Sequence, residues 1–121
     1  MDETGMKKVL VIDDEEYIRS SVVSFLEDQD YDVMEAGDGR EGIQAFEAGS
    51  PDLILCDLRM PGMDGLDVLA RLGELGSKVP VIIVSGAGNI SDTVEALRLG
   101  AWDYIIKPIQ DMNVLHHAMN K

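Results

Sequence analysis

The stretch Val9–Asp14, VLVIDD, decides the fold, because four consecutive apolar residues lead directly into two acidic ones. A short strand that is apolar at every position is typical of a parallel sheet with helices on both faces. Similar runs occur at Leu53–Asp57, LILCD, at Val81–Ser85, VIIVS, and at Tyr104–Lys107, YIIK. Each run ends on a polar residue. Because the carboxyl ends of parallel strands share one edge of a sheet, we expect these polar residues to meet in one crevice.

The polar residues at this edge form a chemically consistent set, namely Asp13, Asp14, Asp57, Ser85 and Lys107. Carboxylates packed together repel one another unless a cation joins them. Oxygen ligands suit a hard divalent ion such as Mg²⁺, and a lysine beside them adds a positive charge for an anionic group such as phosphate. Taken singly, each residue is more often a helix cap, a turn residue or a surface lysine. Their coincidence at four strand ends predicts a metal and phosphate site.

Five repeats of strand then helix predict the α/β class. The expected strands are Val9–Ile12, Asp32–Glu35, Leu53–Cys56, Val81–Val84 and Tyr104–Ile106. The second strand alternates between polar and apolar residues, which is typical of the edge of a sheet.

Local signals predict the helix boundaries. The first helix is expected from Glu16 to about Asp28, since apolar residues recur there at helical spacing. Two cap-and-third-residue pairs, Asp38 with Glu41 and Asp64 with Asp67, open the second and third helices. A fourth helix starts at Asn89 or Ser91, has Val94 and Leu97 on its apolar face, and ends at Gly100 in a left-handed cap.

A fifth helix is expected from about Asp111 through Ala118, close to the last residue, Lys121. We expect residues 1–6 to form a flexible N-terminus and residues 7–121 to form one domain. No stop signal follows the fifth helix, so this domain would be cut near the end of that helix from a longer protein.

Composition narrows the functional classes. Ten basic and 23 acidic residues give a net charge of −13, which disfavours direct binding to nucleic acid by this domain. The single cysteine excludes an intramolecular disulfide and favours a reducing, cytoplasmic location. The apolar runs are far shorter than the roughly 18 residues of a membrane span, so no membrane association is expected.

The chain resembles the receiver domain of bacterial two-component response regulators over essentially its whole length. The matching motifs are the acidic pair Asp13-Asp14, then Asp57, Ser85 and Lys107-Pro108, each after a strand, with Tyr104 at the family's switch aromatic. The resemblance implies a flavodoxin-like (βα)5 three-layer sandwich with a parallel five-stranded sheet in the order 2-1-3-4-5.

The resemblance also implies roles for these residues. Asp57 would be the phosphoacceptor, taking a phosphoryl group from a histidine of a sensor histidine kinase or phosphotransfer protein. Asp14, Asp57 and the backbone carbonyl of Arg59 would ligate Mg²⁺, and Asp13 would hold a metal-bound water. Lys107 would pair with the phosphoryl group, and Ser85 would donate a hydrogen bond to it. Such a domain catalyses only its own phosphorylation and dephosphorylation, so it is a regulatory module and not an enzyme with a separate substrate.

In the family, Ser85 and Tyr104 would form the switch that changes the surface of the fourth helix and fifth strand. That surface would contact an output domain or protein partner, or form a homodimer. Arg59 and Ala87, two residues after Asp57 and Ser85, match positions whose residue type tunes dephosphorylation. The segment Val84–Met119 most resembles receivers with phosphatase-like output domains, as in adaptors that deliver a stress sigma factor to proteolysis.

Two other phosphate-handling families compete with this interpretation. A phosphotransferase of the haloacid dehalogenase type also forms an aspartyl phosphate, but it needs a DxD signature where this chain has Asp57-Leu58-Arg59. A flavin-binding flavodoxin needs a loop rich in Ser, Thr and Gly after its first strand. The acidic run Asp13–Glu16 takes that place here and would repel a phosphate.

Overall fold

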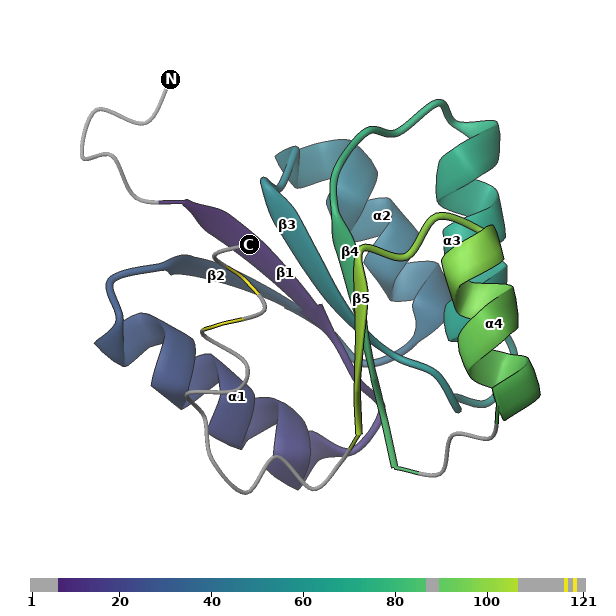
Figure 1. Ribbon diagram of the computed structural model, residues 1–121. Coiled ribbons are helices and arrows are strands. Elements are labelled where there is room, and N and C mark those ends of the chain that lie inside the picture. The colour runs from purple at the N-terminus through teal and green to yellow at the C-terminus, as the bar shows by residue number, and fades with distance from the viewer. Residues whose placement is uncertain (1–6, 87–89, 107–116, 118, 120–121) are drawn as a thin grey trace.

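The computed structural model describes residues 7–86, 90–106, 117 and 119, which form alternating strands and helices (Figure 1). In chain order the elements are β1 (Lys8–Ile12), α1 (Glu16–Asp28), β2 (Asp32–Ala36), α2 (Gly39–Gly49), β3 (Leu53–Asp57), α3 (Gly65–Glu74), β4 (Val81–Ser85), α4 (Ile90–Arg98) and β5 (Asp103–Ile106). Every predicted strand is present, and each is one residue longer than expected.

The sheet is parallel throughout and has the order β2-β1-β3-β4-β5, which confirms the predicted topology. Its register determines what meets at the carboxyl edge. Ile12 on β1 lies opposite Cys56 on β3, so Asp13 and Asp57 follow at the same level on neighbouring strands. Asp57 in turn lies opposite Val84 on β4, directly before Ser85.

Alternate residues of the buried strands pack in two separate hydrophobic cores, because successive side chains point to opposite faces of a sheet. Leu10 and Ile12 pack in the core that α2, α3 and α4 cover. Val9 and Val11 pack in the second core, which α1 covers from the other face (Figure 1). The sheet therefore lies between two helical layers, as the apolar strands predicted.

The helix caps agree closely with the sequence signals. The Asp38 carboxylate accepts a hydrogen bond from the Glu41 N–H at 2.8 Å. Asp64 and Asp67 form a reciprocal capping box, with hydrogen bonds of 3.0 and 3.1 Å. Gly100 has a φ of +103°, so the turn after α4 uses the left-handed conformation that favours glycine.

Helix α4 differs from the expectation in two respects. It begins at Ile90, so the alternative start at Ser91 is wrong, and Asn89 lies outside the described residues. Val94 and Leu97 are half-exposed, at 49% and 50%, and Ala96 is the helix residue that packs in the core. The described part of α4 therefore contacts the sheet through a small side chain and leaves its larger apolar residues in solvent.

Residues 1–6 and most of the predicted fifth helix lie outside the described residues. His117 and Met119 are described, and both are helical. Nothing in the described ranges combines the length and apolar character that a membrane-spanning helix requires.

Candidate functional site

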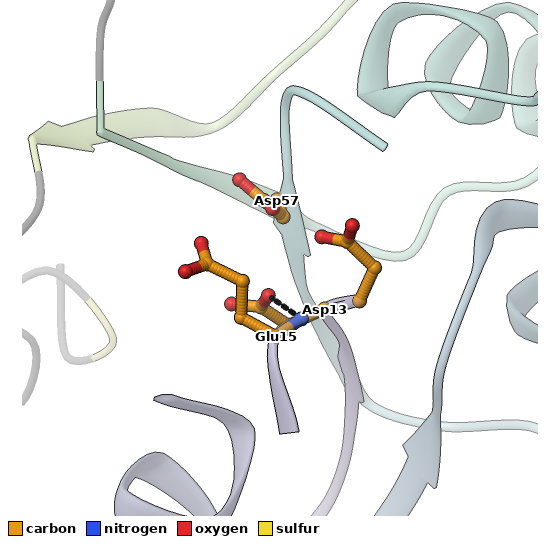
Figure 2. Close-up of side chains that lie close together, drawn as sticks. Asp13, Glu15 and Asp57 are labelled. Atoms are coloured by element: carbon orange, nitrogen blue, oxygen red, sulfur yellow. Dashed lines mark hydrogen bonds between the residues drawn. The ribbon is translucent and has the colours of Figure 1, made fainter. Parts of the chain in front are cut away.

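Four acidic side chains gather where β1 and β3 end. Figure 2 shows Asp13, Glu15 and Asp57 lying close together at this edge. One carboxylate oxygen from each of Asp13, Asp14, Glu15 and Asp57 lies within 4.8 Å of the others. Asp13 and Asp57 are buried, with 5% and 4% exposure, whereas Asp14 and Glu15 are exposed. The group has two shielded carboxylates under two that face solvent.

This all-oxygen donor set fits a hard divalent cation. Carboxylates this close repel one another, and the buried pair cannot rely on water to screen that repulsion. Mg²⁺ commonly takes one or two carboxylates and keeps several waters, which matches two buried aspartates beside an open, solvent-facing side.

Glu15 joins this group although the sequence analysis did not select it as a candidate ligand. The sequence feature that could have indicated Glu15 as a ligand is its position in the acidic run Asp13–Glu16. The turn between β1 and α1 directs its carboxylate back toward Asp57, which the strand pattern alone does not reveal.

Hydrogen bonds hold the β1–α1 turn that carries this group. The Asp13 carboxylate accepts a hydrogen bond from the Glu15 N–H at 2.9 Å (Figure 2). The Asp13 N–H donates to the Ala36 carbonyl at 3.1 Å, and Arg19 donates to the Asp13 carbonyl at 2.6 Å. Arg19 also forms an ion pair with Glu35 at 3.1 Å. The acidic turn is thus bound on both sides to β2 and α1.

On the other side of the site, Asp57 is the last residue of β3, and the loop after it returns to the start of α3. The Gly65 N–H donates to the Leu58 carbonyl at 2.8 Å, which closes this loop. Arg59, two residues after Asp57, is exposed and forms an ion pair with Asp92 on α4. The loop therefore contacts both α3 and α4.

Cys56 precedes Asp57 and is fully buried. Burial raises the pKa of the Cys56 thiol far above its ordinary value, and the neighbouring Asp57 charge raises this pKa further. The thiol therefore remains protonated, and it donates to the Asp57 carbonyl at 3.3 Å. This residue belongs to the core and does not supply a thiolate ligand.

Of the remaining predicted residues, Ser85 and Tyr104 lie on the β4–β5 side. Ser85 is fully buried at the end of β4. The Tyr104 ring on β5 packs against the core that α2, α3 and α4 cover, and its buried hydroxyl has no hydrogen-bond partner among the described residues. Lys107 and Ala87 lie outside the described residues.

Comparison with known proteins decides the family. The family model described as "Response regulator receiver domain" matches residues 9–120. The chain belongs to this family. Receiver domains are regulatory parts of two-component systems, where response regulators work with kinases and output domains, and they bind Mg²⁺ at an acidic pocket. Membership therefore favours the receiver interpretation over the dehalogenase and flavodoxin alternatives.

Individual relatives agree with this assignment. The receiver domain is 35% identical over 111 residues to the chemotaxis protein CheY of Listeria monocytogenes, covering 91% of this chain and 93% of that protein. It is also 35% identical over 113 residues to Regulator of RpoS of Escherichia coli, covering 93% of this chain. This chain spans only 34% of the length of Regulator of RpoS.

Solved structures show the same fold. The receiver domain protein of Methanospirillum hungatei, described as CheY-like, superposes with a TM-score of 0.89 at 29% identity, covering 96% of this chain and 93% of the other. The signal receiver domain of a LuxO repressor protein homologue from Vibrio parahaemolyticus also gives a TM-score of 0.89, at 30% identity, covering 95% and 88%.

Proposed function

We propose that this receiver domain is a phosphorylation switch in which Asp57 accepts a phosphoryl group from a sensor histidine kinase or phosphotransfer protein. The observation that carries the proposal is the position of Asp57, which is 4% exposed and lies within 4.8 Å of three other carboxylates. Asp57 is the buried acid that ends the central strand β3, whereas Asp13 is tied into the turn by the Glu15 N–H.

In the proposed reaction a carboxylate oxygen of Asp57 attacks the phosphorus of a phosphohistidine. An O–P bond forms, the N–P bond breaks, and the histidine leaves as a neutral or protonated imidazole. Asp13, Asp14 and Asp57, together with the backbone carbonyl of Arg59, would hold Mg²⁺, and Glu15 lies close enough to assist. When bound, the ion would neutralise charge on the carboxylates and on the phosphoryl oxygens. The protein's own contribution is to orient the acceptor and to shield it from bulk water.

Ser85 and Lys107 would contact the phosphoryl group after transfer. Ser85 follows Val84, which lies opposite Asp57, so its hydroxyl is on the adjacent strand. Lys107 follows β5 in the sequence, and its pairing with the phosphoryl group stays a prediction. These roles make the domain a module that modifies itself and not an enzyme with a separate substrate.

The output surface would be the face of α4 and β5. Its exposed apolar residues are Ile90, Val94, Leu97 and Ile106. Several large apolar side chains on one small region favour a protein partner, an output domain or a second copy of the chain. We propose Ser85 and Tyr104 as the residues that link this face to Asp57. The similarity to Regulator of RpoS supports a sigma-factor adaptor as one kind of output.

The decisive experiment is phosphorylation by acetyl phosphate with Mg²⁺, followed by intact mass. The wild-type chain should gain about 80 Da, one phosphoryl group, and Asp57→Asn should not. Asp28→Asn, which removes an exposed acid at the end of α1, serves as the control and should phosphorylate like the wild type. A mass gain that persists in Asp57→Asn would refute the assignment.

A further inference from the structure

One ion pair connects the loop after Asp57 to the first turn of α4. Arg59 lies two residues after Asp57, and Asp92 is the third residue of α4. The Arg59 guanidinium donates to the Asp92 carboxylate across a sequence separation of 33 residues. The pair therefore links the loop after β3 to helix α4.

The burial of the two partners is unequal. The Asp92 side chain is 14% exposed, whereas that of Arg59 is 58% exposed. Leaving a shielded carboxylate without a compensating charge costs more free energy than leaving an exposed carboxylate without one. The guanidinium can move without losing its hydration, so Arg59 is the mobile partner and Asp92 the anchored one.

The described start of helix α4 buries little apolar surface. Ala96 is the buried residue of the helix, and it lies beyond the first turn. Ile90 at the start is 84% exposed, and Val94 is 49% exposed. Because apolar burial usually supplies most of the packing free energy of a helix, polar contacts such as the one at Asp92 contribute to holding this turn.

We infer that Arg59 is a positioning residue that exchanges partners, binding Asp92 in the resting domain and the phosphoryl oxygens when Asp57 is phosphorylated. This inference rests on the proposed function of Asp57. A phosphoryl group brings up to about two negative charges to a residue two positions from Arg59. Guanidinium groups bind phosphoryl oxygens well because their paired N–H donors match the oxygen geometry.

The exchange couples phosphorylation to α4. Loss of the ion pair removes the link at the first turn, so residues 90–93 open more readily. By linkage, the factor by which phosphorylation weakens the Arg59–Asp92 pair equals the factor by which that pair weakens phosphoryl binding. This route to α4 is separate from the one proposed through Ser85 and Tyr104.

Beryllofluoride with Mg²⁺, which mimics the phosphoryl group, tests the coupling through a double-mutant cycle of Arg59→Gln and Asp92→Asn. Asp92→Asn should bind beryllofluoride about threefold more tightly, which is the scale of one partly exposed ion pair. In the Arg59→Gln background the same change should have almost no effect. Glu95→Gln, which removes an acid from the same helix that pairs with Arg98, should behave like the wild type.

Equal tightening by Asp92→Asn in both backgrounds would show a general charge effect and overturn the exchange. If beryllofluoride does not bind the wild type, the proposed function itself fails, and the inference falls with it. Binding without coupling overturns the inference alone.

Hydrogen exchange of the α4 amides gives an independent readout. In the resting domain, Asp92→Asn and Arg59→Gln should each speed exchange of the amides of residues 94–96, whose N–H groups bond the carbonyls of the first turn, and beryllofluoride should have the same effect on the wild type. The α3 amides should not change in either variant. Unchanged exchange at residues 94–96 in both variants would show that the pair does not hold the helix, and the proposal would be wrong.

Discussion

The backbone of Gly65 lies directly against that of Asp57. A Cβ atom at position 65 would lie 2.5 Å from the Asp57 carbonyl oxygen and 2.9 Å from the Leu58 Cα, closer than real Cβ contacts allow. The neighbouring atoms are backbone and cannot rotate away. The first residue of α3 is therefore held against the proposed acceptor by the absence of a side chain.

Gly65→Ala should destabilise the domain by about 1–3 kcal/mol, the usual cost of forcing extra volume into a packed site. It should also slow phosphorylation by acetyl phosphate, because the loop after Asp57 must shift. Urea unfolding and intact mass measure the two effects.

The matched control is Gly73→Ala, also on α3, where a Cβ meets nothing within 4 Å. That change should raise stability by up to about 1 kcal/mol through helix propensity. Equal effects at both positions would contradict the contact.

Mg²⁺ should raise the melting temperature of the wild type, because an ion that binds the folded state relieves the repulsion among Asp13, Asp14 and Asp57. The gain approaches about 2.7 kcal/mol when free Mg²⁺ is roughly 100 times its Kd. Asp14→Asn should lose most of this response and melt at a higher temperature than the wild type in EDTA. Thermal unfolding with and without Mg²⁺ measures both, with Asp28→Asn as the control. An undiminished response in Asp14→Asn would mean that this residue is not a ligand.

Cys56 should make stability depend on pH in the alkaline range. Burial raises the pKa of its thiol far above the ordinary value of 9.0, so the folded state keeps its proton while the unfolded chain loses it. The stabilising effect is fully present below pH 9.0 and declines as the pH rises above it, toward the folded pKa. The predicted slope is about −1.4 kcal/mol of unfolding free energy per pH unit.

Cys56→Ala removes this dependence but keeps the other titrating groups. Urea unfolding between pH 8 and 10.5 gives the free energy of unfolding at each pH. Above about pH 9, where the unfolded thiol ionises, this free energy should fall for the wild type relative to the variant, so that the two pH curves converge. Parallel curves would show that the thiol does not titrate differently in the two states.

Tyr104→Phe should not destabilise the resting domain. Within the part of the chain that the structure describes, the buried Tyr104 hydroxyl has no hydrogen-bond partner, and such a group costs about 1–3 kcal/mol. Its removal should raise the unfolding free energy by about 1 kcal/mol, while Tyr17→Phe, at a residue 85% exposed, should change it by less than about 0.5 kcal/mol. A loss of stability in Tyr104→Phe would show that the hydroxyl does have a partner.

Local sequence patterns determined the elements of this domain. Runs such as Val9–Ile12 are apolar at every position, so they predicted buried parallel strands whatever the rest of the chain does. The caps at Asp38 and Asp64 were equally readable, because a cap joins residues three apart in the sequence. The same reasoning brought Asp13 and Asp57 to one edge, since strand ends of a parallel sheet coincide.

Tertiary structure alone decided which side chains complete the site and which elements it contacts. Glu15 enters the acidic group only because the β1–α1 turn directs it back toward Asp57. The partner of Arg59 is 33 residues away, and no local pattern selects Asp92 from the other acids of the chain. The exposure of Val94 and Leu97 depends on how α4 lies on the sheet. Short-range patterns reflect backbone preference and burial, whereas these features depend on distances between side chains that only the packed helices and strands establish.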